Sequence, residues 1–142
     1  MNAELREHLM RQLIRYEGKR NLMYLDSEQV PTIGIGHSLR NSISDAAVAQ
    51  IFTDDVNGVE RDVERELPWV AALSLPRQAV IYDMAFNLGI TGLLGFHATL
   101  AAIQSEQWEQ ASAAMLASQW ARQVGRRAEE LALQMVTGEW SH

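Results

Sequence analysis

The chain has 142 residues, of which 47% are hydrophobic and 21% charged, a composition typical of a single globular domain that excludes a disordered protein. It contains no cysteine, which excludes a disulfide scaffold, a thiol nucleophile and a thiolate zinc site. Its formal net charge is −6, so the chain lacks the excess of basic residues that drives nucleic-acid binding. No run of its residues reaches the roughly 18 apolar residues of a membrane span. We therefore expect neither nucleic acid nor a stably inserted membrane among its partners.

The first third of the chain predicts a helix followed by a β-hairpin. Residues 5–16 place their leucines on one helical face, and Gly18 tolerates the left-handed conformation that often ends a helix. Short apolar runs over residues 22–35 flank a polar turn at 26–29, which is typical of two antiparallel strands. Pro31 would open the second strand, where its missing N–H group is tolerated.

From Ser44 onward the patterns are helical. Ser44 is a favourable N-cap for a long helix that ends near Pro68. The apolar residues of this helix recur at steps of three and four: Val48, Ile51, Phe52, Val56, Val59, Val63 and Leu67. The segment 74–76 predicts the start of another helix and Gly89 its end. Shorter helices are expected over 99–104, 106–117 and 126–136.

These elements predict an α+β, mostly helical fold in which a small lobe with the hairpin leads through a long helix into a helical lobe. The interface between two such lobes is a natural place for a substrate cleft. Tryptophans in helical stretches are more often core residues than sugar platforms, so we expect a core position for each of them: Trp69, Trp108, Trp120 and Trp140.

Three polar residues stand out around the hairpin. Glu17 lies at the predicted helix end, Asp26 enters the turn, and Thr32 begins the second strand. A carboxylic acid beside a second carboxylate is the minimum equipment for cleaving a glycosidic bond. Taken alone, however, two acids nine residues apart in an acidic protein are more commonly a solvated surface pair.

The stretch from Glu17 to His37 resembles the active-site signature of the phage-type lysozymes, glycoside hydrolase family 24. Its Glu–Gly pair, the tyrosine two residues before Asp26 and the Thr-Ile-Gly-Ile-Gly-His run all fall at the family spacing. The resemblance extends along nearly the whole chain. Its further matching positions are 83–89, Thr91, Gly92, Gly95, Phe96, Trp108, Trp120, Arg127 and 137–140.

The resemblance implies a role for each of the three polar residues. Glu17 would be the general acid, Asp26 the second carboxylate, and Thr32 the residue whose hydroxyl holds the nucleophilic water. Three residues would contact the substrate: Gly36, Phe86 and Asn87. Two supporting ion pairs are also implied, His37 with Asp55 and Glu17 with Arg127.

The implied fold is a single lysozyme-like domain over residues 1–142. Its hairpin lobe would cover about 13–55, including the start of the connecting helix, and its helical lobe would combine 1–12 with 56–142. The implied activity is a muramidase that hydrolyses the β-1,4 linkage between N-acetylmuramic acid and N-acetylglucosamine in bacterial peptidoglycan. We expect single-displacement inversion, no cofactor and a monomer.

The expected setting follows from the same resemblance and from the N-terminus. Charges interrupt every apolar run near Met1, so the sequence predicts no secretory signal. We therefore expect an endolysin made in the cytoplasm of a host bacterium, which acts on the cell wall after release through a holin.

The chain also departs from the family pattern. Between Leu39 and Ser44 it has only four residues, where the T-even phage enzyme carries a longer insertion, so we expect one shorter cleft wall. Ala114 stands where an asparagine touches sugar in that enzyme. The best-known member is strongly basic, whereas this chain is acidic, so any attraction to anionic peptidoglycan would be local or weak.

Two other functions compete with a hydrolase. A lytic transglycosylase would keep a catalytic glutamate but dispense with Asp26 and Thr32, so the intact trio argues against it. An inactive or weakly active cell-wall-binding relative stays open, because the cleft wall is altered.

The sequence predicts no metal site. Residues 53–64 approach the spacing of a calcium loop, but Thr53 occupies the first ligand position and the apolar periodicity favours a continuous helix. The histidines form no helical ligand pair: His8, His37, His97 and His142.

Overall fold

The computed structural model describes residues 1–141, leaving His142 outside the described residues. The chain divides into two compact units, Met1–Val48 and Ala49–His142. An antiparallel sheet and seven α-helices confirm the predicted α+β, mostly helical fold. The predicted lobe boundaries, in which 1–12 join the helical lobe, concern the packing of one unit on the other and stay a prediction.

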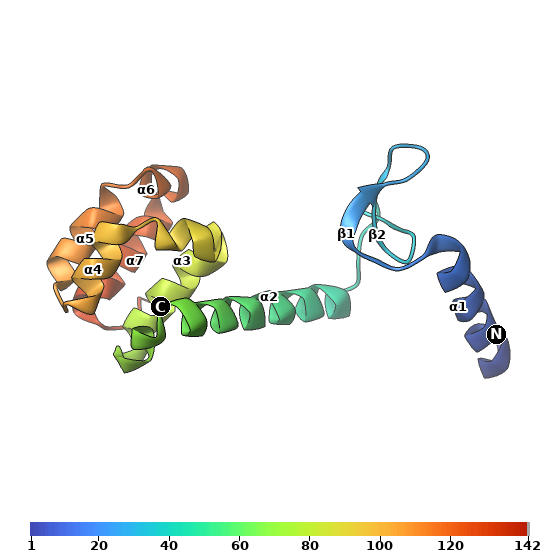
Figure 1. Ribbon diagram of the computed structural model, residues 1–142, viewed down its shortest axis with the longest axis horizontal. Coiled ribbons are helices and arrows are strands. Elements are labelled where there is room, and N and C mark those ends of the chain that lie inside the picture. The colour runs from blue at the N-terminus through green and yellow to red at the C-terminus, as the bar shows by residue number, and fades with distance from the viewer. Residues whose placement is uncertain (142) are drawn as a thin grey trace. The chain divides into compact units, whose positions relative to one another are not determined.

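The first unit begins with α1 (Ala3–Glu17), as the apolar periodicity predicts (Figure 1). The Asn2 side chain caps its start by accepting the Leu5 N–H group at 2.8 Å. Its end lies at Gly18, which adopts φ 72° and donates its N–H to the carbonyl group of Ile14 at 2.9 Å. The glycine therefore fixes Glu17 as the last helical residue.

The sheet of this unit contains β1 (Arg20–Leu25), β2 (Pro31–Gly34) and β3 (His37–Ser38), antiparallel and in that order. Pro31 opens β2, which confirms the predicted hairpin. The pairing places Tyr24 opposite Thr32, and Thr32 opposite Ser38 on its other side. The sequence did not predict β3, because a strand of two residues carries no alternation.

The long predicted helix is α2 (Asp45–Glu66), which begins in the first unit and continues into the second. Ser44 caps it by accepting the Ala47 N–H group at 3.2 Å, and Pro68 follows its end. A 3-10 turn, η1 (Pro68–Ala72), leads into α3 (Leu75–Leu94). Gly89 lies inside α3 with φ 73° and ψ 160°, so it kinks the helix rather than ending it as predicted.

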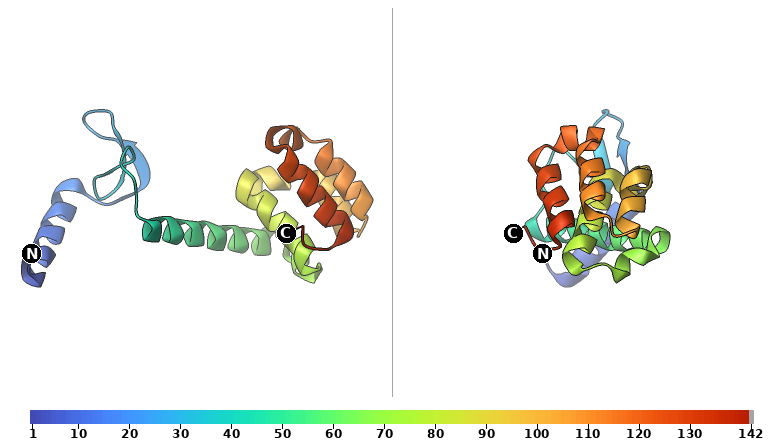
Figure 2. Two further views of the ribbon diagram at one scale, coloured as in Figure 1. Left: turned by 180° about the vertical axis from the view of Figure 1, so that it is seen from behind. Right: turned by 90° about the vertical axis from the view of Figure 1, so that its left-hand side faces the viewer.

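The second unit is completed by four helices packed together with α3 (Figures 1 and 2). They are α4 (His97–Gln104), α5 (Trp108–Leu116), α6 (Gln119–Val124) and α7 (Arg126–Thr137). Of these, α6 was not predicted, because six residues give too little periodicity. Among residues 1–141 no single helix is long and apolar enough to span a membrane; α3 and α4, bent by 105°, meet that test only as a pair.

The core of the second unit is apolar and centred on α3. Fully buried side chains from α3, α4, α5 and α7 meet there: Val80, Ile81, Met84, Ile103, Met115 and Met135. Trp120 is also buried, and Trp69 and Trp108 pack against the core, which confirms their predicted positions. Trp140 is 60% exposed, so its predicted core position is wrong; it lies beyond the last helix, where no neighbouring turn covers it.

Polar contacts tie the start of α3 to the end of α7. The Arg77 guanidinium donates to the carbonyl groups of Met135 and Val136 at 2.8 and 2.9 Å. Its charge also lies 3.9 Å from the centre of the Trp108 ring. Because the last carbonyl groups of a helix lack partners within the helix, Arg77 supplies donors where α7 needs them.

Candidate active site

The Glu17 carboxylate lies against the backbone of Gly36, in the turn between β2 and β3. A methyl group added at Gly36 would come within 2.8 Å of Glu17 Oε2 and 3.0 Å of its Cδ. Gly36 also has φ 69°, a conformation that favours glycine. The structure thus brings together the predicted acid and a predicted substrate-contacting residue, and leaves the Glu17 side chain exposed to solvent.

Asp26 organises the turn between β1 and β2. Its Oδ1 accepts the N–H groups of Glu28 and Val30, each at 2.8 Å. Its own backbone N–H donates to the Val30 carbonyl group at 3.1 Å, and its carbonyl group accepts the N–H of Gln29, which has φ 62°. One carboxylate oxygen is therefore engaged by the backbone, and this fixes the orientation of the other.

Thr32 is buried in β2, with only 3% of its surface exposed. Its hydroxyl group donates to the Val30 carbonyl group at 2.9 Å, so its remaining capacity is to accept hydrogen bonds. A water molecule bound to this oxygen would donate one proton to it and keep a lone pair for attack. The Val30 backbone links Asp26 to Thr32, because its N–H donates to the Asp26 carboxylate and its carbonyl group accepts from the Thr32 hydroxyl.

A further pair of side chains lies on this sheet. The Arg20 guanidinium carbon is 4.6 Å from the centre of the Tyr24 ring. The sequence signature includes Tyr24 only by its spacing from Asp26, and Arg20 was not predicted as a site residue. The stacking depends on the β1 backbone between them, where the register with β2 shifts, and no sequence period indicates such a shift.

In the second unit, two of the predicted residues lie along one groove between α2 and α3. Asp55 from α2 and Phe86 from α3 help to line this groove, which has a volume of about 450 Å³. Phe86 packs edge-to-face on Phe52, with ring centres 6.0 Å apart. Asp54 and Asp62 also face the groove, so it is acidic along α2.

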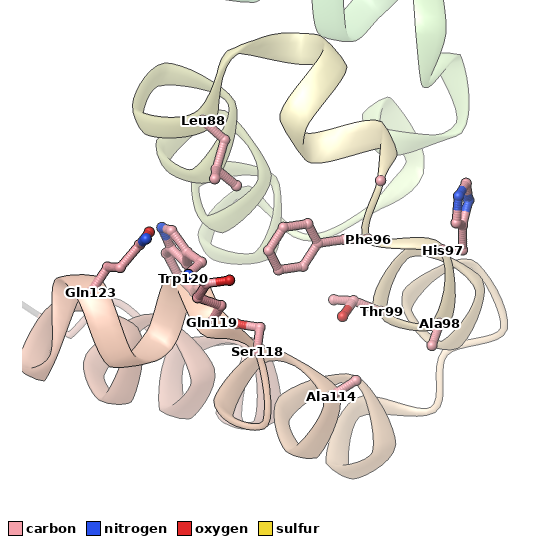
Figure 3. Close-up of a pocket in the computed structure, with 11 residues that line it drawn as sticks. Leu88, Phe96, His97, Ala98, Thr99, Ala114, Ser118, Gln119, Trp120 and Gln123 are labelled. Atoms are coloured by element: carbon pink, nitrogen blue, oxygen red, sulfur yellow. The ribbon is translucent and has the colours of Figure 1, made fainter.

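Asn87 contacts Trp120, which lines a second hollow of about 550 Å³. Its Oδ1 accepts the Trp120 indole N–H at 2.8 Å. Trp120 and Phe96 project into the hollow from α6 and from the start of α4, with their ring centres 6.2 Å apart (Figure 3). Ala114, one of the departures from the family pattern, also lines it.

The predicted supporting residues have the following surroundings. Asp83 Oδ1 accepts a hydrogen bond from Arg127 Nε at 2.8 Å and lies 2.8 Å from Nη2 in an ion pair, which ties α7 to α3. The buried Nε2 of His37 has no hydrogen-bond partner among residues 1–141. The ion pairs His37–Asp55 and Glu17–Arg127 would each join one unit to the other, and they stay predictions. The sequence did not indicate Asp83 as the partner of Arg127, because no local pattern relates residues that are 44 positions apart.

Within residues 1–141 no group of three or more His, Asp or Glu side chains is arranged to hold a metal ion. The candidate residues of the first unit offer two carboxyl groups and a hydroxyl group, those of Glu17, Asp26 and Thr32. An acid that can give up a proton, a second carboxylate of fixed orientation and a hydroxyl acceptor for water are the groups that glycoside hydrolysis requires.

Comparison with known proteins gives a family and two relatives. The family model described as "Phage lysozyme" matches residues 14–134. The chain is 28% identical over 155 residues to the "Pre-baseplate central spike protein Gp5" of Enterobacteria phage T4, an alignment that covers 89% of this chain but only 27% of the spike protein. It is 24% identical over 161 residues to "Probable T4-type lysozyme 1" of Dictyostelium discoideum, covering 91% of this chain and 94% of that protein.

Proposed function

Because the chain belongs to the phage lysozyme family, we propose that it is a muramidase that hydrolyses the β-1,4 linkage between N-acetylmuramic acid and N-acetylglucosamine in bacterial peptidoglycan. The observation that carries the proposal is the position of the Glu17 carboxylate against Gly36, beside the strand that holds Thr32. The matched region includes all three of the residues to which we assign chemistry, Glu17, Asp26 and Thr32.

The proposed mechanism is a single displacement. Glu17 is exposed and donates its proton to the leaving glycosidic oxygen. Thr32 accepts a hydrogen bond from the attacking water on the opposite face of the sugar. Asp26, held by two backbone N–H groups, stabilises the positive charge that develops on the sugar ring.

The acid assignment is tested by Glu17→Gln. An amide keeps the shape of the side chain but has no acidic proton, so we expect the lysis rate to fall by about 10²–10⁴. The measurement is the clearing of a suspension of purified cell walls. Glu28→Gln is the matched control, because it makes the same change at an exposed position in the turn. A Glu17→Gln variant that clears walls at more than a tenth of the parent rate contradicts the assignment.

Inversion is tested by the configuration of the first product. Attack by water opposite Glu17 converts the β-linkage into an α-configured product, which NMR detects during early turnover of a peptidoglycan oligomer. Thr32→Val keeps the shape but removes the hydroxyl acceptor, so we expect slower turnover in a protein that still folds. An initial β-anomer would instead indicate a covalent or substrate-assisted route.

A cell-wall-binding relative without activity is the alternative, favoured by the short connection over residues 39–44 between β3 and α2. It predicts that the parent and Glu17→Gln sediment equally with cell walls and that neither clears them.

For the active enzyme we propose synthesis in the host bacterial cytoplasm and release through a holin, because the substrate lies outside the cytoplasmic membrane. Co-expression with and without a holin tests that route through the time of lysis.

A further inference from the structure

Arg20 and Tyr24 lie on the same face of the sheet as Thr32. Directly opposed residues of antiparallel strands project to the same face, and the structure opposes Tyr24 to Thr32 and Arg20 to Gly34. The guanidinium carbon of Arg20 lies 4.6 Å from the centre of the Tyr24 ring, which agrees with that placement. The stacked pair therefore shares a surface with the hydroxyl group to which we assign the attacking water.

Two glycines keep this surface open beside Arg20. A methyl group added at Gly34, opposite Arg20, would meet no atom within 4 Å. Gly36, two residues later, has its backbone against the Glu17 carboxylate. The strand position opposite Arg20 therefore carries no side chain that could cover it.

The charge of Arg20 is uncompensated. Among residues 1–141 Arg20 forms no ion pair, a property that it shares with most of the chain's arginines. Its side chain is exposed, and the contact with the Tyr24 ring orients the planar guanidinium without using its N–H donors. Such a fork of free donors suits the bidentate binding of a carboxylate.

We propose that Arg20, oriented by Tyr24, is a specificity residue that binds a carboxylate of the peptide attached to the glycan chain. This inference rests on the proposed function, because it concerns the substrate of the same site. Mature peptidoglycan carries its carboxylates on these peptides, since the lactyl carboxyl group of muramic acid is consumed in the amide bond that attaches them. In a protein of net charge −6, a local cation on the same sheet face as Thr32 offsets the repulsion of an anionic wall polymer.

The test compares two substrates: purified peptidoglycan, and the same material stripped of its peptides by an amidase. The quantity measured is the ratio of kcat/KM for the peptide-bearing substrate to that for the stripped one. We expect Arg20→Gln to lower this ratio about three- to tenfold, mainly through KM, because an exposed charge-assisted contact is lost. Arg20→Lys should lie between Arg20→Gln and the parent, because an ammonium group keeps the charge but loses the fork.

Matched variants separate specificity from charge and from folding. Lys19→Gln removes the same charge one residue earlier, outside the strand, and we expect it to keep the parent ratio. Tyr24→Phe should keep the ratio because its ring still stacks, whereas Tyr24→Leu should lower it. Raising the salt concentration should lower the ratio of the parent more than that of Arg20→Gln.

The outcomes distinguish the inference from the proposed function. If the parent cleaves neither substrate, the proposed function is wrong and the inference falls with it. If the parent cleaves both, and Arg20→Gln has the same ratio as Lys19→Gln, only the inference is overturned. A lower ratio in Arg20→Gln and Tyr24→Leu, with the ratio retained in Lys19→Gln and Tyr24→Phe, supports it.

Discussion

The two units of this protein are stabilised by different interactions. Every hydrophobic residue that is buried in the structure belongs to the unit Ala49–His142, where helices α3, α4, α5 and α7 share one apolar core. In the unit Met1–Val48, the buried residue is Thr32, and local order comes from backbone hydrogen bonds, the Asp26 turn and glycines at positive φ. The proposed chemistry thus lies in the unit whose geometry depends on turns, and the stability lies in the other.

Stability and activity should therefore respond to different substitutions. Core substitutions in the second unit should lower the free energy of unfolding by large amounts. Substitutions around the turns of the first unit should mainly change the rate of wall lysis and lower that free energy by less, about 1–2 kcal/mol at a glycine of positive φ.

The largest effect is expected for Met84→Ala. Met84 is fully buried in α3, so truncation leaves a cavity and should lower the free energy of unfolding by about 2–5 kcal/mol. Urea unfolding followed by far-UV circular dichroism measures it. Leu133→Ala is the control, because Leu133 is 61% exposed on α7. An equal loss in the free energy of unfolding for the two variants would contradict the burial of Met84 in the core.

A smaller effect, mainly on activity, is expected for Gly36→Ala. Its new methyl group would lie 2.8 Å from Glu17 Oε2, so the carboxylate must move. Because a misplaced catalytic group costs rate steeply, we expect wall lysis to slow by about 10- to 100-fold. Cell-wall clearing at equal concentrations of folded protein measures the change.

Gly34→Ala is the matched control for that substitution. Gly34 has the same φ of 69°, so the backbone strain is the same, about 1–2 kcal/mol. However, a methyl group at Gly34 meets no atom within 4 Å. If both variants lose the same activity, backbone strain and not displacement of Glu17 is the cause.

The smallest effect concerns Tyr82 on α3. Partial burial, together with the charges of Glu64 and Glu60 on α2, raises the pKa of Tyr82 above its usual value of 10.0. A raised pKa in the folded state means that the stabilising contribution is present below the unfolded pKa and is lost as pH rises through the folded value. We therefore expect Tyr82→Phe to reduce the slight loss of stability above about pH 10. The measurement is the shift of the urea midpoint between pH 8 and pH 10.5, for the parent and for Tyr82→Phe. An equal shift in the two proteins would contradict the prediction.

The sequence predicted most of the fold because its helices are long or sharply punctuated. The sequence alone indicated the apolar periodicity of α2, its N-cap at Ser44 and the proline after its end. The two-residue strand β3 and the six-residue helix α6 were not, because neither is long enough to establish a period. Gly89 was predicted to end its helix, but the helix resumes after it, because packing decides whether a chain stops or continues after such a glycine.

The candidate site was predictable only where its residues are close in sequence. Glu17, Asp26 and Thr32 share one motif, so their spacing indicated them together. The contact between Glu17 and Gly36 depends on how α1 meets the turn after β2, which no local pattern encodes. The stack of Arg20 on Tyr24 depends in the same way on an irregular strand register.

The bonds from Arg77 to Met135 and Val136 have a consequence for biosynthesis. They join the start of α3 to a segment translated almost sixty residues later, and Gln134 adds a bond from its side chain to the carbonyl group of Pro76 at 2.8 Å. Because chains emerge from the ribosome N-terminus first, α3 is made long before the partners that anchor it. We therefore expect nascent chains that stop before residue 130 to stay sensitive to protease, and protection to appear abruptly once α7 has emerged.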